Sequence, residues 1–467
     1  MPRDPASQFG TPDHRDVGAS HGRANHRLYV GEGAHGWSWT SPERSMLVLG
    51  PSRSGKTSSL VIPNILLAEG PVVSTSTKPD VMQATSPPRA HKGWNFLFDP
   101  SGEIECPPGV QRVGWSPLTT AHEWDAAVHT SFAMVHASRL VSSAGSRLSG
   151  QDHWSERAGA LLAPLLHAAA LEKYSVRSVI HWINRHDGAT ALQILSKTVG
   201  EDATPTDLLA GIVATDAREQ SGIWSTASGV MAAYQSEAAL ASAELPPLDA
   251  HEFCRGSNTM FVCSAGRQQQ QFAPLVVAAL GDVRDATYDR TRRGESATPT
   301  LFALDEVANI APLPDLPAVV SEGGGQGLLV MACLQDLSQA RSRWGAAADG
   351  FVSLFATTVV LPGIADVSTL RNLSALAGEH EVATTTLGQS VGDRGRIRPS
   401  NSVSTVRLDR HPVDAISRGV PGHALMVTTE KEFLSVTLTP AHACSPWREQ
   451  IGRVGPVLDR EPPGRGR

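Results

Sequence analysis

The sequence of 467 residues predicts an α/β fold whose parallel sheet is interrupted by an all-helical insertion. Short apolar runs that end in polar or acidic residues alternate with helical stretches in both outer parts of the chain, as a parallel sheet requires. Between residues 119 and 245 these runs disappear, and Ala/Leu-rich stretches at helical spacing replace them. Two motifs that belong to one kind of site lie on either side of this region. The helical region is therefore expected to be inserted into a single α/β domain.

The first motif lies just after the start of that domain. Met46 to Leu49 is a short apolar run expected as a buried strand, and Gly50 to Thr57 fits the pattern G-x-x-x-x-G-K-[ST]. Glycines let successive backbone N–H groups surround phosphate oxygens, and the helix that follows adds the positive end of its dipole. The predicted nucleotide contacts are Gly50, Pro51, Ser52, Arg53, Ser54, Gly55, Lys56, Thr57 and Ser58.

The second motif supplies two carboxylates. Leu301 to Leu304 is an apolar run closed by Asp305 and Glu306. We expect Asp305 to hold Mg²⁺ through water and the Thr57 hydroxyl to be a Mg²⁺ ligand. Lys56 is expected to reach the outer phosphates, and Glu306 to orient and deprotonate the attacking water. The expected cofactors are therefore ATP and Mg²⁺.

The next apolar run, Leu328 to Leu334, ends at Gln335. An amide at the end of the strand beside the acidic one can contact both the γ-phosphate and the water, so Gln335 is a candidate for coupling hydrolysis to movement. The alternative is an ordinary helix-capping pair with Asp336. Lys56 and Asp305 lie 249 residues apart, which GTPases and small kinases rarely show, and no N-K-x-D-type motif is suitably placed for guanine.

Composition sets the expected compartment. The net charge of −6 argues against a generally basic surface, and the five scattered cysteines suit buried thiols in a reducing compartment. We see no signal peptide, and the most apolar helical stretch, residues 158–171, is too short to span a bilayer. The expected location is the cytoplasm, either free or held by partners at the inner face of the cell membrane.

Four parts are predicted along the chain. They are a disordered arm (1–25), a discontinuous nucleotide-binding domain (26–118 and 246–445), an inserted all-α domain (119–245) and a C-terminal tail (446–467). Residues 392–402, with Arg394, Arg396 and Arg398, are expected to form an exposed basic loop that contacts DNA or is merely solvated.

Seven segments together resemble a known family, the coupling ATPases of type IV secretion and bacterial conjugation, also called TraG/TraD-like DNA-transfer proteins. Besides the phosphate loop, the resemblance rests on Ser76-Thr77-Lys78-Pro79-Asp80, Gln151-Asp152-His153-Trp154, Ile223-Trp224-Ser225-Thr226, Leu304-Asp305-Glu306-Val307-Ala308-Asn309-Ile310, Leu334-Gln335-Asp336-Leu337-Ser338-Gln339 and Leu361-Pro362-Gly363 with Asp366. These segments span roughly residues 25 to 440.

The resemblance implies a RecA-like P-loop NTPase domain with an inserted all-α domain, assembled as a homohexamer that binds ATP between subunits. Such a ring would move single-stranded DNA with its relaxase, or protein substrates, towards type IV secretion channel proteins. Members of the family complete the site with an arginine from the neighbouring subunit, and Arg44 occupies that position. Some carry a second arginine in the loop that corresponds to Glu322–Gly327; that loop has none here, and Arg371 is a substitute candidate.

The chain departs from many members in showing no N-terminal transmembrane helices. A separate membrane-anchored partner would supply the attachment, or the protein would work without direct attachment. The alternative to a translocase is a non-motor, nucleotide-gated adaptor that recruits relaxase or effector proteins.

Overall fold

A twelve-stranded sheet forms the centre of the protein, which the computed structural model describes over residues 26–142, 151–264, 269–295, 298–391 and 397–452. The strand order is β2-β1-β14-β13-β10-β3-β9-β8-β4-β7-β5-β6. From β10 to β6 all neighbouring strands are parallel, whereas β13, β14, β1 and β2 continue the sheet in antiparallel pairs. The predicted parallel α/β sheet is confirmed.

The strand bounds follow. They are β1 (Tyr29–Gly33), β2 (Gly36–Trp39), β3 (Met46–Leu49), β4 (Val72–Ser76), β5 (Asn95–Phe98), β6 (Val110–Val113), β7 (Thr259–Cys263), β8 (Thr300–Leu304), β9 (Leu328–Leu334), β10 (Thr357–Val360), β13 (His423–Val427) and β14 (Phe433–Thr437). Every residue of β3, β8 and β9 is buried, because helices cover both faces of the sheet there. β6 was not predicted, since its central Gln111 and Arg112 break the apolar run at the edge of the sheet.

The two largest hydrophobic clusters of the described residues lie on the two faces of the sheet, and β3 contributes to both. Leu47 and Leu49 belong to the larger core, whereas Met46 and Val48 face the other. The larger core continues without interruption into the helical insertion, where it includes Trp224. The insertion is therefore packed onto the sheet by the same apolar contacts that hold the sheet's own helices.

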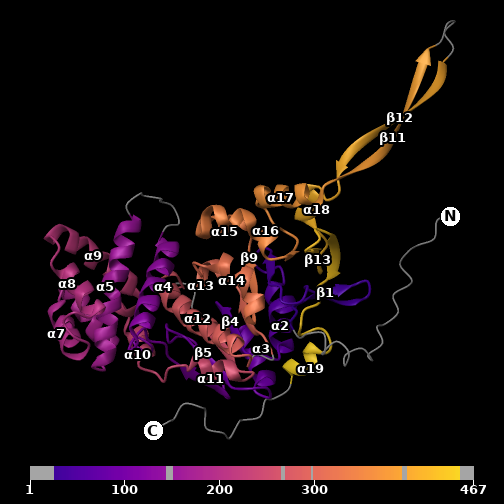
Figure 1. The fold of residues 1–467 in the computed structure, drawn as a ribbon. Coiled ribbons are helices and arrows are strands. Elements are labelled where there is room, and N and C mark those ends of the chain that lie inside the picture. Colours follow the sequence, from indigo (N-terminus) through magenta and orange to yellow (C-terminus); the bar gives the residue numbers. More distant parts are fainter. Residues whose placement is uncertain (1–25, 143–150, 265–268, 296–297, 392–396, 453–467) are drawn as a thin grey trace.

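Helices outside the insertion cover the sheet (Figure 1). They are α2 (Ile62–Leu67), α3 (Asp80–Arg89), α12 (Gln269–Arg292), α13 (Val307–Ile310), α14 (Leu316–Glu322), α15 (Leu337–Trp344), α16 (Phe351–Leu354), α17 (Val367–Ala377), α18 (Val413–Arg418) and α19 (Trp447–Ile451). The sequence predicts one helix over residues 57–68 with a kink at Pro63, but the segment is a π-helix, Thr57–Val61, followed by α2. Pro63 cannot donate a backbone hydrogen bond, which fits the change of helix type beside it.

The insertion between β6 and β7 contains helices and, over its described residues, no strand. Its helices are α4 (Trp124–Ser142), α5 (Gln151–Leu171), α6 (Val176–Arg185), α7 (Ala189–Thr198), α8 (Thr204–Val213), α9 (Ala217–Val230), α10 (Glu237–Ala243) and α11 (Ala250–Arg255). The sequence predicts one helix over residues 222–243, but α9 passes into a 3-10 helix, Met231–Gln235, and Ser236 is extended before α10.

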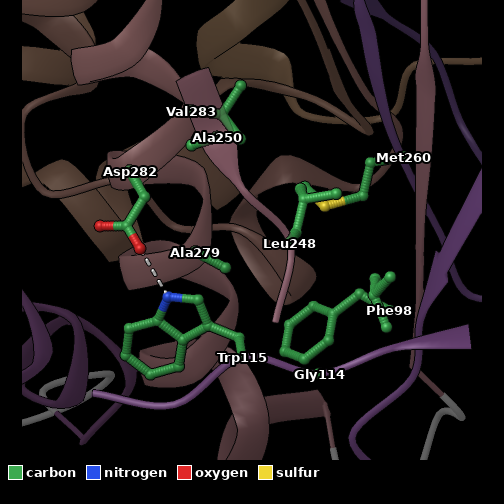
Figure 2. A pocket seen from close by; sticks show the side chains of 10 residues that line it. Phe98, Gly114, Trp115, Leu248, Ala250, Met260, Ala279, Asp282 and Val283 are labelled. Carbon is green, nitrogen blue, oxygen red and sulfur yellow. Dashed lines mark hydrogen bonds between the residues drawn. The ribbon is translucent and has the colours of Figure 1, made fainter. Parts of the chain in front are cut away.

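A tryptophan at the start of the insertion is tied to α12 (Figure 2). The Trp115 indole N–H donates to Asp282 Oδ2 at 2.8 Å, beside Phe98 and Met260. Burial raises the pKa of Asp282 to about 6, although the bond from Trp115 opposes that shift. This contact joins the entrance of the insertion to the helix that packs between the insertion and the sheet.

A two-stranded hairpin of β11 (Glu379–Val391) and β12 (Ile397–Asp409) extends away from the body (Figure 1). The prediction of a basic loop over residues 392–402 is therefore wrong for residues 397–402, which are strand. Arg394 and Arg396 lie outside the described residues. The β-branched Thr and Val residues of both strands, together with their regular antiparallel register, explain the hairpin.

Two predictions about the ends of the chain lie wholly or mostly outside the described residues. These are the arm over residues 1–25 and most of the tail, from residue 453 onwards. The division into four parts stays a prediction. Among the helices that the structure describes, none has the length and apolar character needed to cross a membrane.

Candidate nucleotide-binding site

The phosphate loop connects the buried strand β3 to the π-helix. The Gly50 N–H donates to Leu334 O at 3.1 Å, which fixes the start of the loop to the end of β9. At the other end the Ser59 N–H donates to Gly55 O at 2.9 Å and begins the helix. Gly55 has φ +98°, a conformation that residues with a Cβ rarely adopt, so glycine is required there.

Unpaired polar groups gather along this loop. Over the described parts of the chain, no acceptor lies within hydrogen-bonding range of the N–H groups of Gly55, Lys56 and Thr57. The Ser54 hydroxyl oxygen is buried and also has no partner among those residues. Free N–H groups at the start of a helix, next to its positive dipole end, suit an anion such as phosphate.

Lys56 folds back over the loop to which it belongs. Its ammonium group donates to Gly50 O at 2.5 Å and to Pro51 O at 2.9 Å, and the side chain is buried. These two carbonyls hold a positive charge in the centre of the loop. The arrangement keeps Lys56 where the sequence predicts it to meet phosphate.

One hydrogen bond joins the two motifs. The Thr57 hydroxyl donates to Asp305 Oδ2 at 2.7 Å, although the residues lie 248 positions apart in the sequence. Burial raises the pKa of Asp305, while the Thr57 hydroxyl and the nearby Lys56 charge oppose that shift. A second bond, from the Thr75 hydroxyl to Asp305 O at 3.1 Å, holds the backbone of the acidic residue to β4.

Glu306 occupies a left-handed backbone conformation, with φ +55° and ψ +49°, at the start of α13. A non-glycine residue held in this region stores strain, which is common at functional sites. The Asn309 amide donates weakly to Glu306 Oε2 at 3.4 Å, and its backbone N–H donates to Glu306 O at 2.9 Å. α13 therefore sets the orientation of the carboxylate that the sequence predicts to be catalytic.

Gln335 follows β9, the strand that lies between β3 and β8. Leu334, the last residue of β9, is the register partner of Leu49, so Gln335 is next to the phosphate loop and one strand from Asp305. Its backbone N–H donates to Gln339 Oε1 at 2.8 Å, whereas Asp336 caps α15 by accepting from the Ser338 N–H. Capping is thus carried out by Asp336, and the role of Gln335 stays a prediction.

The segment Leu361-Pro362-Gly363 packs on the phosphate loop. The Leu361 N–H donates to Leu49 O at 2.8 Å. A Cβ added to Gly50 would lie 2.8 Å from the Leu361 Cβ, and one added to Gly363 would lie 3.0 Å from Pro51 Cγ. No local sequence signal reveals this contact, because it joins segments about 300 residues apart.

Arg44 is exposed and precedes β3, at the end of the strand opposite the phosphate loop. The four residues of β3 span about 13 Å, which exceeds the reach of an arginine side chain. The segment Glu322–Gly327, predicted as a loop, is instead the end of α14 followed by a 3-10 helix, Gly323–Gln326. It lies at this same edge, where Gly324 packs against Glu43. Arg371 is exposed on α17, which follows the segment packed on the phosphate loop.

The fold, with its parallel α/β sheet and helical insertion, is similar to that of solved structures of a plasmid coupling protein. Plasmid coupling protein TrwB in complex with the non-hydrolysable ATP analogue ADPNP has a TM-score of 0.62 and 18% sequence identity, covering 92% of this chain and 96% of that chain. TrwB with ADP and Mg²⁺ has a TM-score of 0.61, 19% identity and 85% coverage of both chains. TrwB with the GTP analogue GDPNP has a TM-score of 0.63 and 18% identity, covering 90% and 88%.

The sequence also matches a family model over part of its length. Residues 299–417 match the model described as the TraM recognition site of TraD and TraG. The predicted resemblance to TraG/TraD-like coupling proteins is confirmed by this match together with the fold. No curated protein sequence matches the chain.

Proposed function

We propose that this protein is an ATP-hydrolysing coupling protein. It would bind and move single-stranded DNA, or a relaxase–DNA nucleoprotein, towards a type IV secretion channel used in conjugation. The observation that carries the proposal is the 2.7 Å bond between Thr57 and Asp305, because it unites the phosphate loop and the acidic strand in one site. The nucleotide-bound TrwB structures of the same fold support it.

The residues present fit a nucleotide with Mg²⁺. The Thr57 hydroxyl and the Asp305 carboxylate are hard oxygen donors, which Mg²⁺ prefers. A buried carboxylate whose pKa is raised by burial gains from a cation beside it. When bound, Mg²⁺ neutralises charge on the phosphate oxygens. The free N–H groups of Gly55, Lys56 and Thr57 would hold the phosphates themselves.

The chain's own residues then have distinct tasks in hydrolysis. Lys56 would donate to phosphate oxygens in place of the carbonyl oxygens of Gly50 and Pro51, because its ammonium group already lies in the centre of the loop. Glu306 would orient a water and accept its proton, with the backbone at α13 holding its geometry. Gln335, which follows β9, would contact the outer phosphate, so that loss of this phosphate would change the position of α15, which begins two residues later.

Arg44 is proposed to act on the nucleotide of a neighbouring subunit in a homohexamer. It cannot reach the phosphate loop of its own chain across the length of β3, so any catalytic role requires a second copy. In a ring, each interface would then combine the phosphate loop of one subunit with Arg44 of the next. Arg371 is the candidate for a second cation, since the segment Glu322–Gly327 contains no arginine or lysine.

Protein partners are proposed at the region of residues 299–417, because the matching model is described as a recognition site. This region includes the hairpin, which extends away from the body (Figure 1). The proposed partners are relaxase, channel proteins and a separate membrane-anchored protein that holds the ring at the inner face of the membrane.

The test is ATP hydrolysis across a protein concentration series, with and without single-stranded DNA. The proposal predicts that specific activity rises with assembly and with DNA. Lys56→Ala should lose binding and hydrolysis, whereas Glu306→Gln should bind ATP but lose about 10²- to 10⁴-fold in rate. Tight ATP binding with negligible turnover under every condition would contradict the motor and favour the nucleotide-gated adaptor.

A further inference from the structure

A buried arginine on α15, Arg343, connects α15 to α13 beside the nucleotide site and to α4 in the helical insertion. The Arg343 side chain is only 8% exposed. Its Nε donates to Ala308 O at 2.8 Å, and Nη1 donates to Leu140 O at 3.0 Å. Ala308 belongs to α13, and Leu140 lies in the last turn of α4 in the helical insertion.

Both acceptors are carbonyls at helix ends. The last four carbonyls of a helix lack partners within the helix, and a cation there also interacts favourably with the helix dipole. Arg343 therefore stabilises the C-terminal end of α4 and the single turn of α13 with one guanidinium group. Because this group is planar and its donors are fixed relative to one another, the two acceptors are held at a defined separation.

The other end of each connected element reaches the nucleotide site. α13 begins directly after Glu306, and α15 begins two residues after Gln335. α15 is eight residues long, about 12 Å, and short enough to move as a rigid unit. A displacement at Glu306 or Gln335 would therefore reach Arg343 without passing through a flexible loop.

A neighbouring arginine on the same helix points to a different element. Arg341 donates to Asp366 Oδ2 at 2.8 Å, and Asp366 caps α17. The Leu337 N–H also donates to the Thr369 hydroxyl of α17 at 3.1 Å. α15 thus has one arginine directed to α17 and another directed to α13 and α4, which provides a matched pair for experiment.

We infer that Arg343 couples the state of the nucleotide site to the helical insertion through α4. The inference rests on the proposed function, because it requires nucleotide to bind beside Glu306 and Gln335. Arg343 is a positioning residue in this scheme, since it acts through backbone carbonyls. α4 packs against α5 and α12, so a change at its C-terminal end would spread through the insertion.

Hydrogen exchange of α4 measured by mass spectrometry, with and without a non-hydrolysable ATP analogue and Mg²⁺, tests the inference. Binding of a fluorescent ATP analogue is measured separately for each variant. In the wild type, nucleotide should change exchange in the last turns of α4 by about fivefold or more, the lower end of usual coupling strengths. Arg343→Met should bind nucleotide yet lose this response, and Arg341→Gln should keep it.

Three outcomes are distinguished. If nucleotide binds but α4 does not respond in the wild type, or responds equally in Arg343→Met, the coupling is overturned and the proposed function stands. If the wild type binds no nucleotide, the proposed function fails and the coupling with it. If circular dichroism finds Arg343→Met unfolded, Arg343→Lys replaces it, because lysine keeps the charge but not the geometry that reaches two acceptors. Arg343→Lys should bind nucleotide and show a reduced response in α4. A full response in α4 would overturn the coupling.

Discussion

Replacing Gly363 tests whether the Leu361-Pro362-Gly363 segment supports the phosphate loop. Gly363 has φ +96°, so alanine there costs about 1–3 kcal/mol in strain. The added Cβ would also lie 3.0 Å from Pro51 Cγ and push against the loop. Overpacking costs about 1–3 kcal/mol. If about 1 kcal/mol of this cost displaces the phosphate loop and weakens nucleotide binding, the affinity for ATP falls about fivefold.

Titration with a fluorescent ATP analogue, together with thermal unfolding, measures the two parts of this effect. Gly378→Ala is the matched control, because Gly378 has φ +73° but nothing lies within 4 Å of an added Cβ. Both variants should unfold at lower temperature, and only Gly363→Ala should bind nucleotide more weakly. Equal affinities for Gly363→Ala and the wild type, or equal losses in both variants, would refute the reasoning.

Two further predictions concern the ring and the insertion. Lys56→Ala and Arg44→Ala should each be inactive alone, but an equal mixture should restore about a quarter of wild-type hydrolysis. In mixed rings, that share of interfaces combines an intact Lys56 with the intact Arg44 of a neighbouring subunit. No recovery of hydrolysis would exclude action between subunits. Burial raises the pKa of Asp282 to about 6, although the bond from Trp115 opposes it, so the folded state binds this proton more tightly than the unfolded state. As pH rises from about 4 to about 6, Asp282 therefore lowers the free energy of unfolding by about 3 kcal/mol. Asp282→Asn should raise the unfolding temperature at pH 7.5 but not near pH 4. Parallel profiles of unfolding temperature against pH for the variant and the wild type would contradict this.

The sequence was sufficient for the parts of the site that depend on local pattern. The apolar run before Gly50 and the run that ends at Asp305 both form buried strands of the parallel sheet. Their placement two strands apart, with β9 between them, brings Thr57 to Asp305. Such motifs are readable because a parallel sheet gathers the ends of its strands at one edge.

Other features were missed because they depend on contacts between distant segments. The packing of Gly363 on Pro51 and the bonds of Arg343 to two helix ends have no periodicity in the sequence. The hairpin was also missed, since its Thr- and Ser-rich strands lack the apolar face that marks a core strand. The edge strand β6 escaped for a related reason, because Gln111 and Arg112 interrupt its apolar residues.

The most direct test of the central claim is the effect of Mg²⁺ on binding of a fluorescent ATP analogue. If Thr57 and Asp305 form one site with the phosphate loop, Mg²⁺ should tighten binding by the wild type by about tenfold or more. Thr57→Val and Asp305→Asn should still bind the nucleotide but lose most of that effect, and Thr57→Ser should keep it. An undiminished Mg²⁺ effect in both Thr57→Val and Asp305→Asn would contradict the assignment of this site.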